Sequence, residues 1–353
     1  MFHLLLGFIT AFMLTYAIIP LIVVVARRRS FYDKPNERSA HHTPTPSLGG
    51  IGIFAGMVCG IVLWTPLESF GLLQYLLAAF LLIFLTGVLD DLLPLSPYKK
   101  LGGQLIAALI LAFKAKVALS SLYGIFGIWQ LPEVPAFLLT MFLCVGLINA
   151  FNLIDGINLL AGGIGLLACA FWGVWFHWAS EAGLAMVAFS MAGSLTAFLK
   201  FNYAPAQIFM GDTGSMLIGA VCAVLAIQFI EKSRSLPPGY GWHISAIPAM
   251  SVAILIVPIT DTLSVMMRRI LGGRSPFSAD KTHLHHQLLR LGLNHEQTSG
   301  LLIAATMAFM AFCYVFQSWG FIRLLLAEGL LAVAAVLGLF FVEKNKTAKT
   351  HMP

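Results

Sequence analysis

The chain has 353 residues, a formal net charge of +6, and a composition that is 59% hydrophobic and only 10% charged. A soluble domain carries about 25% charged residues, so this chain has too few to cover a surface that faces water. The composition therefore excludes a soluble globular protein and predicts an all-α, polytopic integral membrane protein.

Apolar stretches of membrane-spanning length recur along the whole chain, and each helix that crosses a bilayer needs about 20 such residues. Basic residues follow the first stretch, at Arg27 to Arg29, and none precedes it. This order predicts a first transmembrane helix with its N-terminus outside, rather than a signal peptide. We expect eleven spans, and hence a cytoplasmic C-terminus: 4–26, 48–66, 70–91, 101–120, 134–152, 159–178, 182–200, 213–231, 246–267, 297–317 and 321–342.

The charges agree with this topology. The inner segments, taken with Lys200, hold 16 of the 21 Lys and Arg residues, as the positive-inside rule requires. All seven Asp residues also lie at or near this face, which suggests a site for a divalent cation. We expect a single transmembrane domain, 1–353, with its active-site loops at 27–47, 92–100, 153–158, 201–212 and 268–296.

The first two polar motifs are "YDKPNERSAHHTPTPSLGG", which contains Lys34, and "GVLDDLLPLSPYKKL", which contains Asp90 and Asp91. Alone, the first reads equally well as a basic inner loop. Adjacent carboxylates such as those of Asp90 and Asp91 repel each other unless a cation or a proton joins them. Because Asp is also unfavourable at a helix C-terminus, a functional role is favoured over a solvated helix end.

The third motif is "NAFNLIDGINLLAGG", in which Asn149, Asn152, Asp155 and Asn158 recur every three residues. If the segment is helical, these side chains form a polar stripe along one face. The alternative is that the polar residues hold transmembrane helices together.

The fourth motif is "FNYAPAQIFMGDTGS", residues 201–215. Gly211 and Gly214 permit a tight turn, and Asp212 then begins the next helix. A helix N-terminus offers free N–H groups that suit phosphate, and Asp212 beside it can hold Mg²⁺. An ordinary helix cap is the alternative for Asp212, and a core aromatic is the alternative to a base-stacking platform for Phe209.

The fifth motif, residues 268–293, combines Arg268 and Arg269 with His283, His285 and His286. Cations in this number suit a lipid phosphate or a nucleotide diphosphate. The histidines could instead bind zinc, but no Cys lies nearby and H-x-H-H lacks the usual paired spacing.

Taken in order, "DKPNERSAHHTPTPSLGG", "LDD", "NAFNLIDGIN", "FMGDTGS" and "RSPFSADKTHLHH" resemble the polyprenyl-phosphate N-acetylhexosamine-1-phosphate transferases. The resemblance covers residues 33 to 286, and "THLHHQLLRLGL" looks like the branch that transfers GlcNAc. One departure is Asn158, because the family usually has a second Asp at this position. An amide there can still form hydrogen bonds, but without a charge.

The resemblance implies roles for these residues. Asp90 and Asp91 would orient and deprotonate the polyprenyl phosphate, while Asp212 and Asp91 would bind Mg²⁺, with Mn²⁺ as an alternative. His285 and His286 would act in catalysis. Nucleotide and sugar contacts would come from Asn152, Asp155, Asn158, Asn202, Phe209 and His283, and phosphate contacts from Lys34, Arg268 and Arg269.

The implied reaction joins UDP-N-acetylhexosamine and undecaprenyl phosphate, releases UMP, and starts lipid-linked O-antigen, enterobacterial common antigen or a similar polysaccharide. Direct in-line attack is favoured, and a covalent aspartyl-phosphate on Asp90 or Asp91 stays open. The protein would lie in the bacterial inner membrane with its site on the cytoplasmic face. Membrane lipids are the further partners, a homodimer is left open, and no nucleic acid is expected.

Alternatives remain on two levels. Within the enzyme class, the sugar could be GalNAc, FucNAc, QuiNAc or MurNAc-pentapeptide. Outside it, the chain could be an ion-coupled transporter, which would place acids near the bilayer midplane and show inverted repeats, or a non-catalytic lipid-binding relative.

Overall fold

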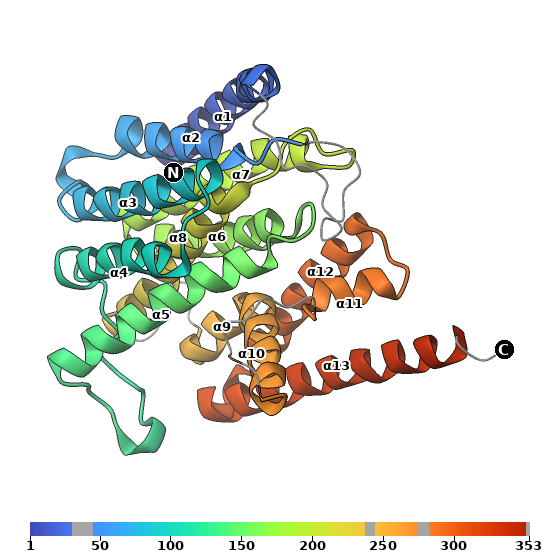
Figure 1. Ribbon diagram of the computed structural model, residues 1–353. Coiled ribbons are helices and arrows are strands. Elements are labelled where there is room, and N and C mark those ends of the chain that lie inside the picture. Colours follow the sequence, from blue (N-terminus) through green and yellow to red (C-terminus); the bar gives the residue numbers. More distant parts are fainter. Residues whose placement is uncertain (30–44, 237–243, 274, 276–281, 351–353) are drawn as a thin grey trace. The chain divides into compact units, whose positions relative to one another are not determined.

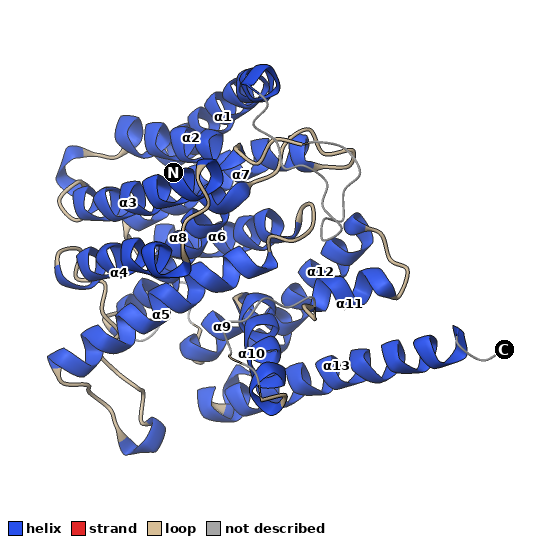
Figure 2. Ribbon diagram, in the orientation of Figure 1, coloured by secondary structure: helices blue, strands red, loops and turns tan. Residues whose placement is uncertain are grey.

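The computed structural model describes residues 1–29, 45–236, 244–273, 275 and 282–350, with side chains as far as residue 346. Within these ranges every regular element is a helix and there is no strand (Figure 2). The all-α prediction is therefore confirmed. The chain divides into two compact units, 1–155 with 161–243 and 156–160 with 244–353.

The first unit contains α1 to α8 (Figure 1). Their bounds are α1 Phe2–Arg29, α2 Gly49–Trp64, α3 Leu73–Leu92, α4 Pro97–Phe113, α5 Glu133–Ile154, α6 Leu160–Trp178, α7 Ala182–Asn202 and α8 Gly211–Arg234, with short 3₁₀ turns at η1 Leu67–Ser69 and η2 Ile125–Gly127. Almost every residue of α8 from Thr213 to Phe229 is buried. Helices α2, α3, α5 and α7 pack around α8, so this helix forms the core of the unit.

The second unit contains α9 Ile247–Ile254, α10 Ile256–Leu271, α11 Leu284–Arg290, α12 His295–Val315, η3 Gln317–Trp319 and α13 Phe321–Thr350. Helices α9 and α10 meet at an angle of 73°, where one straight span over 246–267 was predicted. The cause lies in the sequence, because Pro258 has no N–H to donate to the carbonyl of Ile254. The helix must therefore restart at this point.

All eleven predicted spans contain a helix. Among the described residues, eight helices are long and apolar enough to cross a membrane, or nine with the bent pair α9–α10. Helix α4 ends at Phe113 rather than near residue 120. Beyond it the chain runs as a loop beside α5, where the N–H of Leu119 donates to Thr140 Oγ1 at 2.9 Å. The count of eleven spans and the orientation of both termini stay predictions.

The polar stripe predicted over 149–158 is only partly helical. Helix α5 ends at Ile154, Asp155 follows as its C-cap, and Leu159 has a φ of +70°. Asn149 and Asn152 therefore share a helix, whereas Asp155 and Asn158 lie beyond its end. Gly156 lies directly after Asp155, and both residues favour the end of a helix over its continuation.

Candidate active site

The first polar cluster of the site lies at the start of α8. Asp212 accepts a hydrogen bond from Asn152 Nδ2 at 2.6 Å, and it forms a salt bridge with Lys100. The Lys100 Nζ atom also contacts Asp90 Oδ2 at 3.0 Å and Asn152 Oδ1 at 3.3 Å. Lys100 therefore joins α3, α5 and α8 through an ammonium group between two carboxylates.

Asp90 and Asp91 are adjacent in sequence but serve different neighbours. Asp90 accepts the N–H of Leu95 at 2.7 Å in addition to Lys100. Asp91 turns to α8 and accepts the N–H groups of Asp212 at 2.8 Å and Thr213 at 3.0 Å, as well as the Thr213 hydroxyl. One of the two carboxylates therefore faces a lysine, and the other caps a helix.

The predicted turn before α8 is confirmed, but the predicted free helix start is wrong. Gly211 has a φ of +73°, and a Cβ atom there would lie 2.2 Å from the carbonyl oxygen of Ser47. Asp91 already occupies the first N–H groups of α8, because a carboxylate is itself an anion that a helix N-terminus stabilises. A phosphate that approaches this turn would meet the side chains of Asp212 and Lys100 rather than those two N–H groups.

The loop before α8 is held against residues 46–50. The N–H of Phe209 donates to Pro46 O at 2.8 Å, and its carbonyl accepts the N–H of Gly49 at 2.9 Å. Asn202 is buried and donates from Nδ2 to Ile208 O at 3.0 Å. The end of the first motif, residues 46–50, therefore lies against the fourth motif, residues 201–215. Lys34 lies outside the described residues.

Asp155 belongs to the same unit as this cluster. Loss of hydration raises the pKa of its carboxyl well above the ordinary value, and the carboxylates of Asp212 and Asp91 raise it further. The residue as a whole is half-buried. Four Asp side chains therefore gather near the start of α8, and Lys100 bridges two of them.

The second polar cluster lies in the second unit, between α10 and α11. His283 and His285 are buried with rings stacked 5.5 Å apart, while His286 is only half-buried. Burial lowers the pKa of His285 to about 3, despite the nearby Asp261 carboxylate. Burial therefore favours the neutral form of the His285 ring at physiological pH.

Other predicted residues of this unit already have protein partners. Arg268 donates from Nη2 to Thr282 O at 2.6 Å and from Nε to Ser264 O at 3.2 Å. Arg269 is buried. Asn158 is buried as well, and its backbone carbonyl accepts the Ser299 hydroxyl at 2.6 Å. The ligand roles predicted for these three residues stay predictions.

Comparison with known proteins assigns the chain to a family. Residues 73–230 match the model of glycosyl transferase family 4. The chain is 34% identical to a decaprenyl-phosphate N-acetylglucosaminephosphotransferase of Mycobacterium leprae, over 86% of this chain and 81% of that protein. It is 33% identical to the undecaprenyl-phosphate alpha-N-acetylglucosaminyl 1-phosphate transferases of Salmonella typhi (84% and 79%) and Escherichia coli (80% and 75%).

The chain belongs to glycosyl transferase family 4. Membership confirms the resemblance drawn from the five motifs, and it identifies the protein as a transferase with a polytopic membrane fold.

Lys100 and Asp261 lie at the centres of the two clusters of the transferase, although the sequence analysis predicted no role for either. Lys100 stands near the end of the motif "GVLDDLLPLSPYKKL", nine residues after Asp91. Asp261 was noted only as one more acid at the inner face. Their contacts join positions far apart in the chain, such as Lys100 and Asp212, which no local pattern reveals.

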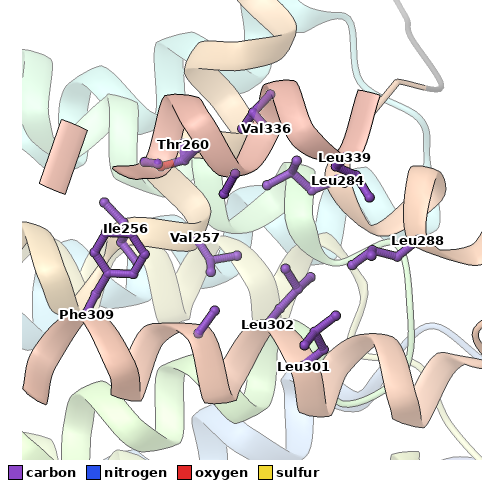
Figure 3. Close-up of a pocket in the computed structure, with 13 residues that line it drawn as sticks. Ile256, Val257, Thr260, Leu284, Leu288, Leu301, Leu302, Phe309, Val336 and Leu339 are labelled. Atoms are coloured by element: carbon purple, nitrogen blue, oxygen red, sulfur yellow. The ribbon is translucent and has the colours of Figure 1, made fainter. Parts of the chain in front are cut away.

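The transferase also has an apolar cavity of about 360 Å³ in its second unit. Figure 3 shows Val257, Leu284, Leu302, Phe309 and Val336 among the side chains around it. The walls come from α10, α11, α12 and α13, and Thr260 is the polar residue among them. Leu284 and Leu288 line the cavity from α11, the helix that also carries His285 and His286.

Proposed function

We propose that this transferase moves GlcNAc-1-phosphate from UDP-GlcNAc to a polyprenyl phosphate and releases UMP. The observation that carries the proposal is the cluster of Asp90, Asp91, Asp155 and Asp212 around Lys100 and Asn152. The names of the relatives support both the sugar phosphate and the polyprenyl acceptor. Undecaprenyl phosphate is the expected acceptor, and decaprenyl phosphate is the alternative that the mycobacterial relative suggests.

The residues of the first cluster fit Mg²⁺. Among the described residues no three His, Cys, Asp or Glu side chains form a metal site of their own. Mg²⁺ is commonly held by one or two carboxylates together with substrate phosphates, so a complete protein cage is not needed. Asp212 and Asp90 would supply the carboxylates, and Asn152 an amide oxygen. The ammonium of Lys100 between the two acids indicates that the position favours a cation.

The reaction joins two anions. An oxygen of the lipid phosphate attacks the sugar-linked phosphorus, the bond from that phosphorus to the bridging oxygen breaks, and UMP leaves with the electron pair. Mg²⁺ would neutralise charge on the diphosphate, and Lys100 adds a second cation close by. Asp90 is the better candidate to orient the acceptor, because Asp91 is held by two backbone N–H groups at the start of α8, whereas one oxygen of Asp90 meets the ammonium of Lys100 beside Asp212.

The apolar cavity of the second unit offers a place for the isoprenoid chain of the acceptor. Its lining is apolar, and the helix that forms one wall also carries His285 and His286, which are predicted to act in catalysis at the phosphate. An occupant with an anionic head and an apolar chain matches both features. Ala305→Trp, which places an indole in the cavity, should raise KM for undecaprenyl phosphate about 10-fold, since about two methylene groups lose their burial.

Ala304→Trp on the exposed side of α12 is the matched control. Farnesyl phosphate, a short-chain acceptor, should be affected little by either change. An unchanged KM for the long acceptor in Ala305→Trp would mean that bilayer acyl chains, not the substrate, fill the cavity.

The remaining parts of the proposal concern place and pathway. The basic inner segments support a bacterial inner-membrane protein whose site faces the cytoplasm, where UDP-sugars are made. The product would start a lipid-linked surface polysaccharide such as O-antigen. Other UDP-N-acetyl sugars are the alternative donors.

The direct experiment incubates purified protein with undecaprenyl phosphate, Mg²⁺ and a panel of UDP-N-acetyl sugars. We expect a lipid-linked product and UMP with UDP-GlcNAc, and loss of both after chelation of the metal. Turnover only with another UDP-sugar would correct the donor, and no turnover with any sugar would overturn the proposal.

A further inference from the structure

Asp261 of α10 is almost completely buried, with 1% of its surface exposed, yet it has no role in the reaction described above. Its two carboxylate oxygens reach two consecutive residues at the start of α11. Oδ2 lies 2.6 Å from His283 Nδ1, and Oδ1 accepts the N–H of Leu284, also at 2.6 Å. One buried carboxylate therefore fixes both a ring and the adjacent backbone.

Thr282, the residue before His283, is also held by a side chain of α10. Arg268 lies seven residues after Asp261, so the two side chains share one face of α10. The Nη2 atom of Arg268 donates to the carbonyl of Thr282 at 2.6 Å, and Gln287 Nε2 donates to the same carbonyl at 2.7 Å. Residues 282–284 are consequently held at several points, and the orientation of His283 follows from these contacts.

The carboxylate also determines which ring nitrogen of His283 carries a proton. An ionised carboxylate can only accept hydrogen bonds, so the nitrogen that faces it must be the donor. His283 Nδ1 is therefore protonated in both the neutral and the charged ring. In the neutral ring the lone pair lies on Nε2, because a hydrogen bond at one nitrogen selects the tautomer at the other.

We propose that Asp261 is a positioning residue of the transferase, which holds His283 so that its Nε2 atom is the one presented to the sugar or diphosphate of the donor. The inference rests on the proposed function and on the predicted contact of His283 with the nucleotide sugar. Asp261 itself would touch no substrate, and its effect on turnover would pass through His283.

The test uses full-length protein in detergent and the variants Asp261→Asn, His283→Ala and the double variant. In Asp261→Asn the amide oxygen can still accept the N–H of Leu284, but its NH₂ group then faces His283 and forces the other tautomer. We expect kcat/KM for UDP-GlcNAc to fall about 10- to 100-fold, as for other residues that orient a functional histidine, with little change in Tm. Glu231→Gln is the matched control, because Glu231 also accepts a backbone N–H and a side-chain donor.

The double variant separates positioning from a merely structural role. If Asp261 acts through His283, adding Asp261→Asn to His283→Ala should lower kcat/KM little further. Multiplicative effects of the two changes would overturn the proposal. So would misfolding of both Asp261→Asn and the more conservative Asp261→Glu, because Asp261 would then be a structural residue.

Nitrogen NMR of ¹⁵N-histidine-labelled protein gives a reading that needs no turnover. His283, assigned by the signals lost in His283→Ala, should show a protonated Nδ1 in the wild type and in Asp261→Glu, and a protonated Nε2 in Asp261→Asn. An unchanged tautomer in Asp261→Asn would contradict the inference. If the wild type shows the expected tautomer but transfers no sugar phosphate, the proposed function fails while the Asp261–His283 contact stands.

Discussion

Both ends of α8 carry an acidic residue, but the neighbours of these two acids differ. At its end, Glu231 accepts the N–H of Ser120 at 2.8 Å and the Ser120 hydroxyl at 2.7 Å, and Arg234 lies 3.6 Å away. Lys232, the next residue of α8, forms a salt bridge with Glu181. At the start of α8, Asp212 shares Lys100 with Asp90, while Asp91 and Asp155 lie close by.

The difference is one of charge balance. At the end of α8, Glu231 has Arg234 as its basic partner and Glu181 has Lys232. These contacts are balanced in charge and need no ligand. At the start of α8, carboxylates outnumber the ammonium that joins them, which is costly unless a further cation or a proton enters. The comparison therefore favours the proposed cation site at the start of the helix, whereas the end of the helix holds a loop.

The largest expected effect comes from removing a charge at each end. Asp212→Asn should lower kcat by about 100-fold or more, because one preorganised electrostatic group at a phosphoryl-transfer site is worth that much. Glu231→Gln should leave kcat within about two-fold of the wild type, as expected for a contact away from the chemistry. Steady-state kinetics over a range of Mg²⁺ concentrations measures both. Equal losses in the two variants would remove the distinction between the ends.

The second prediction concerns the sides of the membrane on which the two ends lie. Gln207, before α8, is exposed, and so is Phe126 in the loop that Glu231 holds. In a background without the five native cysteines, an impermeant maleimide should label Phe126→Cys in intact cells but label Gln207→Cys only after lysis. Labelling of Gln207→Cys in intact cells would reverse the predicted topology.

A third and smaller effect concerns the cap of α8. Asp91→Asn places an NH₂ group against one of the donors that Asp91 now accepts, so we expect the folded state to lose about 1–2 kcal/mol. Ser120→Ala at the other end removes a partly exposed hydroxyl that donates to Glu231 and accepts from Arg234, and it should cost about 1 kcal/mol. Thermal unfolding in detergent measures both. A Tm for Asp91→Asn equal to that of the wild type would show that the cap adds no stability.

A fourth prediction concerns a pH dependence in the second unit. His285 has a pKa of about 3 in the folded protein and an ordinary value of 6.5. The unfolded chain therefore binds a proton first, and the stability that neutral His285 contributes is complete above pH 6.5 and lost as pH falls toward 3. His285→Gln should show a shallower fall in Tm between pH 7 and pH 4. Parallel curves would mean that His285 is protonated in the fold.

The same comparison shows what the sequence could and could not predict. The turn at Gly211 and Asp212 follows from local chemistry, and so do the all-helical fold and the apolar runs. Pro258 carried a signal for the bend between α9 and α10 that the prediction of one straight span overlooked. The polar stripe holds for Asn149 and Asn152 but not for Asn158, because spacing alone does not show where a helix ends.

Other features depend on tertiary contacts. Asp91 caps a helix that begins 120 residues later, and Lys100 bridges acids from two other elements. No sequence feature near Asp91 or Lys100 predicts these partners. The motifs therefore indicated which residues gather at the site, while the division of work among them became visible only in the structure.

The most direct test of the central claim follows the two phosphorus atoms of UDP-GlcNAc. Purified protein receives undecaprenyl phosphate with donor labelled at either the α or the β phosphorus, and the lipid and water phases are then separated. The account predicts that the β label enters the lipid with the sugar and that the α label leaves as UMP. Recovery of both labels in water as UDP, with sugar alone on the lipid, would contradict it.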